Sequence, residues 1–327
     1  MDCRVIFFMK KFLMILMCLM PLMASAQLIA NRNCIKDGYD FWLYVPDDYD
    51  PSVHSKPVIM FLHGRTLCGN DLSIVRNYGC INAIQRGVGI DAIIVAPQAQ
   101  GAWDPKKVHD VYDWVKTHYS VNTRRFYVIG MSMGGYGTLD YVATYPDEVA
   151  AAMAMCGGAT VKSLCGLNEL PLWIVHGTAD TAVSVDCSQR VVDEMCACGD
   201  TSRLIFSKMD RVNHTRLVRV FYLDQTYDWL FSHSLSDSAR VANKSFTLTD
   251  DMLKDAYLDL GKYTSLKVVD NYSSTSAYGE KKYYTVKKGD TLSKIAVENE
   301  TTVSILCKLN KMKKTDKLSV GRKIRVK

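Results

Sequence analysis

The chain of 327 residues is 48% apolar and 23% charged, and its formal net charge is +6. This composition excludes a disordered or fibrous chain, and the length suggests two domains. The charge is uneven, because residues 281–327 contain 14 Lys and Arg against four Asp and Glu. No nucleic-acid-binding motif accompanies this basic end, so we expect no nucleic-acid partner and favour an anionic wall polymer.

The N-terminus has the pattern of a secretory signal peptide. Met9-Lys10-Lys11 precedes an apolar run from Phe12 to Met23, and the small residues Ala24-Ser25-Ala26 follow it. The run is shorter than the ~20 residues of a membrane-spanning helix, which disfavours a retained anchor. We therefore expect residues 1–26 to be a signal peptide that is removed, leaving Gln27 first. The expected location is secreted or periplasmic and associated with the cell wall, with no transmembrane segment after removal.

The cysteines of an exported chain predict disulfide bonds. Eight of them lie between Cys34 and Cys198, which is an even number in an oxidising compartment. Two pairs are close enough in sequence to bond locally: Cys68 with Cys80, and Cys156 with Cys165. Many other connectivities are open, as are free buried thiols. A zinc site at Cys196-Ala197-Cys198 lacks a second ligand pair at suitable spacing, so we expect no metal site.

From Tyr39 to Trp229, short apolar runs alternate with amphipathic stretches. This pattern is typical of strands and helices in a mostly parallel sheet, and the continuous runs suit strands that are covered on both faces. The sequence therefore predicts an α/β fold with helices on both faces of the sheet. The expected strands cover residues 41–45, 57–62, 91–96, 125–130, 150–155, 172–176 and 203–207. The expected helices cover residues 108–118, 134–145, 185–195 and 219–231.

The composition changes after Ser232, where Ser, Thr, Asp, Asn and Lys dominate as far as Lys282. We expect a catalytic domain over residues 27–232 and a polar linker over residues 233–282, with one short helix around residues 250–260. A flexible coil of about 50 residues has a root-mean-square span of roughly 40 Å. Such a linker would tether the two domains without fixing their orientation.

Gly130-Met131-Ser132-Met133-Gly134 is a G-x-S-x-G pentapeptide. The motif alone is common by chance, but residues 125–129 before it are strand-like and residues 135–139 after it open a helix. This context predicts a nucleophile elbow, in which the serine occupies a strained turn between strand and helix. Side chains at positions 130 and 134 would crowd the neighbouring elements. We therefore expect Ser132 to be the nucleophile, against the alternative of a glycine-rich helix start without chemistry.

A serine hydroxyl needs a base, and in this arrangement the acid and then the histidine follow the serine in the chain. Asp180 lies just after the expected strand 172–176, and His214 follows the strand that ends near Ser207. We expect His214 to act as base and Asp180 to orient it. Other candidates are less suitable, because they are expected on helix or domain surfaces: Asp186, Asp193 and His233.

The oxyanion of an acyl-transfer intermediate needs backbone N–H donors. We expect one from Met133, directly after the nucleophile. The other is expected from Arg65, because Phe61-Leu62-His63-Gly64-Arg65 ends an earlier strand with a turn beside the elbow. His63 is then structural.

Residues 39–233 resemble the secreted esterases related to feruloyl esterases and polyhydroxybutyrate depolymerases, some of which are labelled predicted peptidases. The resemblance implies the α/β-hydrolase fold, the Ser132, Asp180 and His214 triad, and no cofactor. It also implies that Gln98 and Trp103 line the substrate pocket, with loop packing as the alternative. Arg65-Thr66-Leu67-Cys68 departs from the small residues usual at this place. The matching pieces are Leu62-His63-Gly64, Ala96-Pro97-Gln98, Trp103-Asp104-Pro105, Gly130 to Gly135, Cys156-Gly157-Gly158, His176-Gly177 with Asp180, and Tyr227-Asp228-Trp229-Leu230.

Residues 283–327 resemble a LysM module. The similarity lies in Tyr284 to Ala296, in Leu306 with Leu309-Asn310, and in Leu318 to Val326. The resemblance implies a small β-α-α-β unit that binds N-acetylglucosamine-containing glycans such as peptidoglycan. The glycan-binding residues that it implies are Gly289, Asp290, Thr291, Leu292 and Asn310.

Together these features predict a secreted serine carboxylic-ester hydrolase, tethered to peptidoglycan by its LysM module. Acetyl or feruloyl esters of polysaccharide are the expected substrates. A serine peptidase on the same triad is one alternative, because this geometry does not distinguish esters from amides. A non-catalytic glycan-binding protein is the other.

Overall fold

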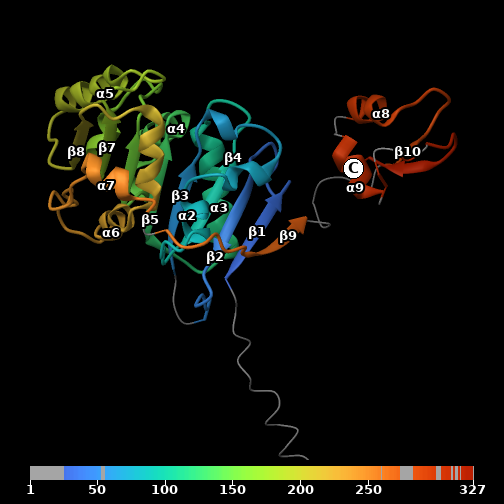
Figure 1. The fold of residues 1–327 in the computed structure, drawn as a ribbon, viewed down its shortest axis with the longest axis horizontal. Helices are drawn as coiled ribbons and strands as arrows, with labels where there is room; N and C mark the ends of the chain where they lie inside the picture. The colour runs from blue at the N-terminus through green and yellow to red at the C-terminus, as the bar shows by residue number, and fades with distance from the viewer. Residues whose placement is uncertain are drawn as a thin grey trace, which may run out of the picture. The chain divides into compact units, whose positions relative to one another are not determined.

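The structure is a computed structural model, and it describes residues 26–52, 56–258, 260–272, 283–299, 303–310, 312–313, 316 and 318–326. The expected signal peptide, apart from Ala26, lies outside these residues. The chain divides into two compact units, one up to Tyr272 and one from residue 273 onwards (Figure 1). In the part of the chain that the structure describes, no helix is long and apolar enough to cross a bilayer.

The first unit is built on a mixed sheet, in which the described strands follow the order β8-β7-β6-β5-β3-β4-β2-β1-β9. Strands β4, β3, β5, β6, β7 and β8 run parallel to one another, whereas β2 runs antiparallel to both β4 and β1. The mostly parallel sheet expected from the sequence is therefore confirmed. The strands are β1 (Gln27–Arg32), β2 (Asp40–Val45), β3 (Lys56–Leu62), β4 (Ile93–Gln98), β5 (Val121–Met131), β6 (Ala151–Met155), β7 (Leu172–Gly177), β8 (Leu204–Met209) and β9 (Lys267–Tyr272).

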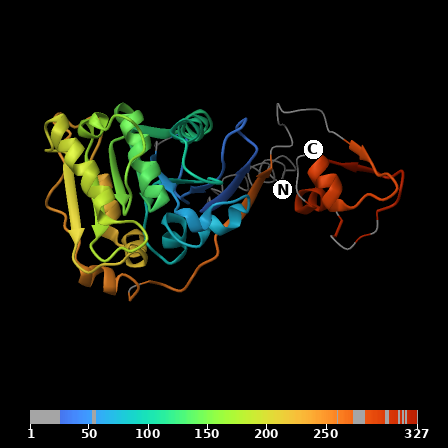
Figure 2. The same ribbon diagram turned by 90° about the horizontal axis from the view of Figure 1, so that it is seen from above.

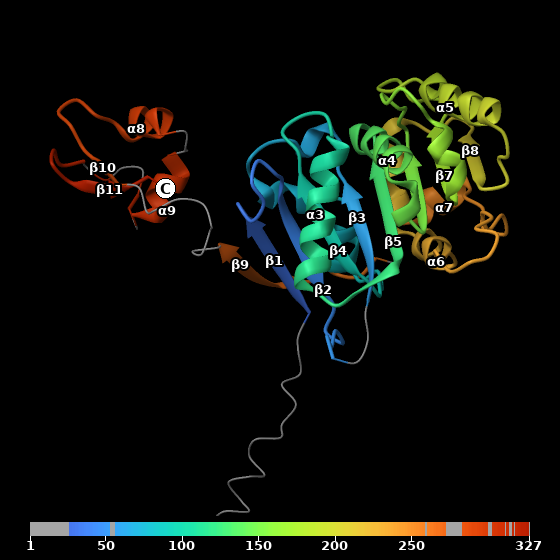
Figure 3. The same ribbon diagram turned by 180° about the vertical axis from the view of Figure 1, so that it is seen from behind.

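Helices cover both faces of the sheet, as Figure 2 shows from above and Figure 3 from behind. Along β3, Ile59 and Phe61 point into one apolar cluster, while Val58, Met60 and Leu62 point into the other. This alternation explains why the strand reads as a continuous apolar run. On the first face lie α2 (Cys80–Gln85), η6 (His214–Tyr222), α6 (Asp224–Phe231) and α7 (Asp250–Asp255); on the second lie α3 (Pro105–His118), α4 (Met133–Thr144) and α5 (Val185–Cys198). Short 3₁₀ helices complete the connections: η2 (Arg65–Leu67), η3 (Leu72–Arg76), η4 (Pro146–Glu148) and η5 (Cys165–Glu169).

The structure differs from the expectation of a linker over residues 233–282. Residues 233–272 pack on the first unit, where Leu253 of α7 is fully buried and β9 pairs in parallel with β1 over the whole of both strands. His233, expected at the surface, is buried, and its Nε2 accepts a hydrogen bond from the N–H of Asn243 at 3.0 Å. Of the expected linker, residues 273–282 and residue 259 lie outside the described residues.

One disulfide joins Cys165 of η5 to Cys198 at the end of α5. Neither of the two local pairings occurs, because Cys80 and Cys156 are buried inside the unit and each is a free thiol. The disulfide also takes Cys198 out of any zinc site with Cys196. The other described cysteines are free: Cys34, Cys68, Cys187, Cys196 and Cys307.

The second unit has the expected β-α-α-β order. Its elements are β10 (Tyr283–Thr285), α8 (Leu292–Glu298), α9 (Val303–Leu309) and β11 (Lys323–Arg325). Strands β10 and β11 pair antiparallel. A small core that includes Val286, Ile295, Leu306 and Ile324 holds the unit together.

Candidate active site

Ser132 occupies the turn between β5 and α4. Its backbone has φ 59° and ψ −122°, a left-handed conformation that costs free energy for a non-glycine residue. Its N–H donates to the carbonyl oxygen of Met155 on the adjacent strand at 2.9 Å. A Cβ at Gly134 would collide with the carbonyl oxygen of Leu62, and one at Gly130 would collide with that of Gly134. The pentapeptide therefore needs both glycines, because the helix begins in contact with the strands.

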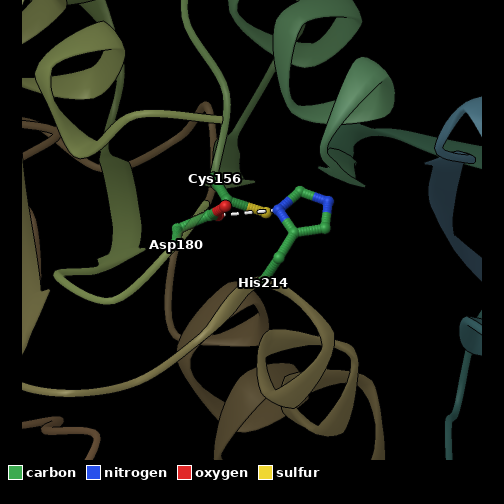
Figure 4. Close-up of side chains that lie close together, drawn as sticks. All are labelled: Cys156, Asp180 and His214. Atoms are coloured by element: carbon green, nitrogen blue, oxygen red, sulfur yellow. Dashed lines mark hydrogen bonds and ion pairs between the residues drawn. The ribbon is translucent and has the colours of Figure 1, made fainter. Parts of the chain in front are cut away.

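Asp180 and His214 form a hydrogen-bonded pair (Figure 4). Asp180 follows β7 and is fully buried, and His214 begins η6, where 20% of its side chain is exposed. His214 Nδ1 lies 2.6 Å from Asp180 Oδ2. The other carboxylate oxygen, Oδ1, accepts hydrogen bonds from the N–H groups of Ala182 and Val183, each at 2.9 Å. Asp180 is thus held in place on both oxygens.

A cavity of about 950 Å³ brings Ser132 and His214 together. No hydrogen bond joins their side chains in the described structure; such contacts often tighten only when substrate binds. The lining is mostly apolar beside the serine, and it includes Met131, Met133, Tyr136, Val183 and Val218. Ser132, His214 and the buried Asp180 come from three loops at the carboxyl ends of β5, β8 and β7, the edge at which ligands bind in α/β sheets.

Two residues that line the same cavity have free backbone donors. The N–H groups of Arg65 and Met133 make no hydrogen bond with any residue that the structure describes, and both residues line the cavity. Gly64 brings the Arg65 turn against the elbow, because a Cβ at Gly64 would lie only 3.4 Å from Ser132 Cβ. Both donors are therefore available to a developing oxyanion.

His63 supports this turn from inside the unit. It is fully buried, its Nε2 accepts from the N–H of Ala99 at 3.0 Å, and its Nδ1 lies 2.8 Å from the carbonyl oxygen of Gly64. A carbonyl only accepts, so Nδ1 carries the proton. Burial lowers the pKa of His63 to about 4, against which the hydrogen bond to Gly64 acts weakly. His63 is therefore neutral and structural.

Gln98 and Trp103 do not line the cavity, contrary to the expectation that they form the substrate pocket. Gln98 is buried, and its Nε2 donates to the carbonyl oxygens of Leu67 and Asp71, each at 3.0 Å. The Nε1 of Trp103 donates to the carbonyl oxygen of His63 at 3.1 Å. Both side chains hold loops around the site, which is the alternative that the sequence left open.

Cys156 is a neighbour of the pair that sequence reasoning did not place there. Its Sγ, a carboxylate oxygen of Asp180 and a ring nitrogen of His214 all lie within 4.8 Å of one another (Figure 4). Burial, and then the charge of Asp180, raises the pKa of the Cys156 thiol. These three groups could hold a soft divalent ion, at the expense of the hydrogen bond between Asp180 and His214. The signal was the position of Cys156 at the end of β6, next to the elbow strand β5.

The residues expected to bind glycan in the second unit are largely structural. Asp290 Oδ2 accepts from Tyr284 Oη at 2.9 Å and from the N–H of Lys287 at 2.8 Å. Leu292 is buried in the core. Asn310 Nδ2 donates to the carbonyl oxygens of Leu306 and Arg325, each at 2.8 Å. Gly289 and Thr291 remain exposed, Gly289 at a turn with φ 86°.

Both units are similar to known proteins. Residues 96–216 match the family model described as "Putative esterase", and residues 284–327 match that of the LysM domain. The solved structure of a thermostable esterase superposes with a TM-score of 0.52 at 21% identity, covering 65% of this chain and 64% of that one. The first unit therefore has the α/β-hydrolase fold. The chain thus joins an esterase-family segment within the first unit to a C-terminal LysM domain.

Two curated relatives match part of the hydrolase unit. A bifunctional acetylxylan esterase/xylanase of Neocallimastix patriciarum is 27% identical over 156 residues, which are 45% of this chain and 22% of that protein. An esterase of Mycobacterium tuberculosis is 28% identical over 142 residues, which are 38% of this chain and 30% of that protein. The chain therefore spans less than a third of the length of either relative.

Proposed function

We propose that the protein is a serine carboxylic-ester hydrolase. The observation that carries the proposal is that one cavity is lined by Ser132 on its strained turn and by His214, which pairs with the buried Asp180. Arg65 and Met133, whose N–H groups are free, line the same cavity. Each member has a defined place in the acyl transfer described below.

In the first step His214 Nε2 takes the proton of Ser132 Oγ, and the oxygen attacks the ester carbonyl. The N–H groups of Met133 and Arg65 stabilise the negative oxygen of the tetrahedral intermediate. As the intermediate collapses, His214 gives its proton to the departing alkoxide, which leaves as an alcohol. In the second step His214 takes a proton from water, and the water oxygen attacks the carbonyl of the acyl-serine. The bond to Ser132 Oγ then breaks as His214 returns the proton to that oxygen, and a carboxylic acid leaves. Asp180 holds the tautomer of His214 and stabilises the imidazolium.

An ester substrate is supported by the relatives, which are named for esterase activity. We propose acyl esters of polysaccharide, with acetyl or feruloyl as the acyl group. The peptidase alternative uses the same residues, but no contact in the cavity favours a peptide over an ester. The non-catalytic alternative leaves the strained serine and the paired histidine without a purpose.

The LysM domain supports a proposal about location. We propose that the protein is exported by its N-terminal signal and held at the cell wall by LysM binding to N-acetylglucosamine-containing glycan, including peptidoglycan. The basic composition of residues 281–327 would add attraction to anionic wall polymers. A sedimentation assay of the mature chain with peptidoglycan tests this, with soluble chitin oligosaccharide as competitor. Failure to sediment, or sedimentation that the competitor leaves unchanged, would contradict glycan binding.

The catalytic proposal is tested on residues 27–327 with a fluorophosphonate probe and short p-nitrophenyl esters. The variant Ser132→Ala is expected to lose labelling and turnover, while Ser202→Ala, at a half-buried serine just before β8 and outside the cavity lining, keeps both. Labelling that persists in Ser132→Ala would show that another residue is the nucleophile. A wild-type protein without labelling or turnover would contradict the enzyme proposal.

A further inference from the structure

Arg65 is the one arginine of the described residues 26–272 whose side chain has no partner. Its guanidinium makes no hydrogen bond, ion pair or ring contact with any described residue. The other arginines of this range each have at least one, as three examples show. Arg216 pairs with Asp250 at 2.7 Å, Arg125 donates to the carbonyl oxygen of Phe231 at 3.0 Å, and Arg240 donates to that of Val149 at 2.6 Å. A free guanidinium on a residue that lines the cavity of Ser132 is therefore an exception that the fold itself does not explain.

Arg65 belongs to the lining of the candidate active site. Arg65 is exposed and lines the same cavity as Ser132 and His214. Its turn is fixed by two backbone hydrogen bonds, from the N–H of Leu67 to the carbonyl oxygen of Gly64 and from that of Cys68 to Arg65, each at 3.1 Å. Cys68 Sγ in turn lies 3.7 Å from the sulfur of Met133, the residue after the nucleophile. The positive charge of Arg65 also acts on the Cys68 thiol, opposing the rise in its pKa that burial causes.

No carboxylate balances this charge within the cavity. Among the described residues that line it, none is Asp or Glu, and Arg65 and His214 are the basic side chains. The polar residues that complete the lining, such as Thr66, Tyr78 and Gln100, carry no negative charge that would pair with a guanidinium. A guanidinium presents its donors in a planar fork that matches a carboxylate on two hydrogen bonds. The missing partner is therefore most simply supplied by the substrate.

We propose that Arg65 makes the cavity selective for acidic esters, in which a carboxylate lies within a few bonds of the scissile ester. This inference rests on the proposed esterase function and adds a substrate class to it. The carboxylate can belong to the acyl group, as in the monoester of a dicarboxylic acid. It can also belong to the alcohol, as in the acyl ester of a hydroxy acid or of a uronate sugar.

The test uses two pairs of esters. Within each pair, the acidic ester has a carboxylate where the neutral ester has a methyl group. Ethyl hydrogen succinate against ethyl butyrate places the charge on the acyl side. O-acetyl lactate against isopropyl acetate places it on the alcohol side. Within each pair, the ratio of kcat/KM for the acidic ester to kcat/KM for the neutral ester is measured. This ratio cancels any effect on catalysis that both esters share.

We expect the wild type to prefer the acidic ester in at least one pair. Arg65→Gln keeps the backbone N–H and is expected to lower that ratio by roughly tenfold, equivalent to ~1.4 kcal/mol. Arg65→Lys keeps the charge and is expected to retain part of the preference. Added salt should weaken it, because the site is exposed to solvent. Lys162→Gln removes one positive charge outside the cavity lining and should leave the ratio unchanged.

The measurements distinguish failure of the role of Arg65 from failure of the esterase proposal. Turnover of both members of each pair without a charge preference, or a ratio that Arg65→Gln leaves unchanged, would overturn the role of Arg65 alone. Failure of all four esters, together with no fluorophosphonate labelling of Ser132, would overturn the esterase proposal and this inference with it.

Discussion

His176 and His214 approach the same carboxylate oxygen of Asp180. His214 Nδ1 lies 2.6 Å from Oδ2, and His176 Nε2 lies 3.4 Å from it. His176 Nε2 also lies 3.0 Å from the carbonyl oxygen of Val183, which can only accept, so this nitrogen carries a proton. Burial lowers the pKa of His176, against the raising effect of that hydrogen bond and of Asp180. His176 is therefore neutral, and its Nε2–H group holds Asp180 and the carbonyl of Val183 in place.

Replacing His176 tests this support. His176→Phe keeps the volume but leaves the carbonyl oxygen of Val183 and the hydroxyl of Ser188 without this partner. We expect the free energy of unfolding to fall by about 1–3 kcal/mol, the penalty for a buried polar group left unpaired. The loosened Asp180 should lower kcat by roughly one to two orders of magnitude. Urea denaturation and ester kinetics measure the two effects. His118→Phe, at an exposed histidine, is the control, and equal stability of the two variants would contradict the role of His176.

Buried histidines predict how stability depends on pH. The pKa of His63 falls from 6.5 to about 4 in the folded state because of burial, and burial also lowers those of His176 and His233. The unfolded chain then binds more protons between these values, so the free energy of unfolding is highest above about pH 6.5 and falls as the pH drops towards 4. His63 alone accounts for ~3 kcal/mol of this loss.

Urea denaturation at pH 7 and pH 4.5 measures that loss. His63→Gln removes the titrating group while keeping an amide that can donate and accept, so its stability should depend less on pH. A wild-type protein as stable at pH 4.5 as at pH 7 would contradict the prediction.

The disulfide predicts a redox effect on stability. It closes a loop of 33 residues between Cys165 and Cys198. By the chain-entropy relation, such a loop stabilises the folded state by about 3–4 kcal/mol. We expect reduction, or Cys165→Ala with Cys198→Ala, to lower the midpoint of urea unfolding. Cys196→Ala changes a free cysteine two residues away and should have little effect. If it destabilised the protein as much as the double variant, the assigned pairing would be wrong.

The sequence predicted the elements whose signals are local. The nucleophile elbow is a pattern of five consecutive residues. Asp180 and His214 each follow a strongly apolar strand, and the parallel topology brings the ends of these strands to one edge of the sheet. The structure adds relationships between distant residues. Strand β9 pairs with β1, although the rest of the first unit lies between them in the chain. Its sequence Lys267–Tyr272 alternates too weakly between apolar and polar residues to be distinguished from a linker. His233 looked exposed because the segment at Asn243 that covers it lies in the same polar stretch.

Gln98 and Arg65 illustrate a second limit. Motif similarity places a residue near a site but does not say which way its side chain points. Gln98 turns inward and donates to two loop carbonyls, whereas Arg65, chosen for its backbone N–H, lines the cavity and its guanidinium has no partner among the described residues. The partners of a polar side chain depend on loops that are far away in sequence, so they require the structure.

The position of residues 233–272 predicts where the chain can be shortened. Leu253 of α7 is fully buried, and Arg219 of η6 donates to its carbonyl oxygen at 2.9 Å. Arg216, two residues after His214, pairs with Asp250. Removing this segment would uncover apolar surface, expose the edge of β1 and release the start of η6. An uncovered strand edge also promotes aggregation.

We therefore expect a chain of residues 27–272 to fold and keep its esterase activity, and a chain of residues 27–232 to aggregate or to lose activity. Circular dichroism, size-exclusion chromatography and ester turnover compare the two. In the full chain, Leu253→Ala should cost about 2–5 kcal/mol of stability, the usual penalty for truncating a buried leucine, whereas Leu258→Ala, at a residue that is 76% exposed, should cost little. If residues 27–232 were as stable and active as residues 27–272, the segment would be a linker after all, and α7 and β9 would contribute nothing to the position of His214.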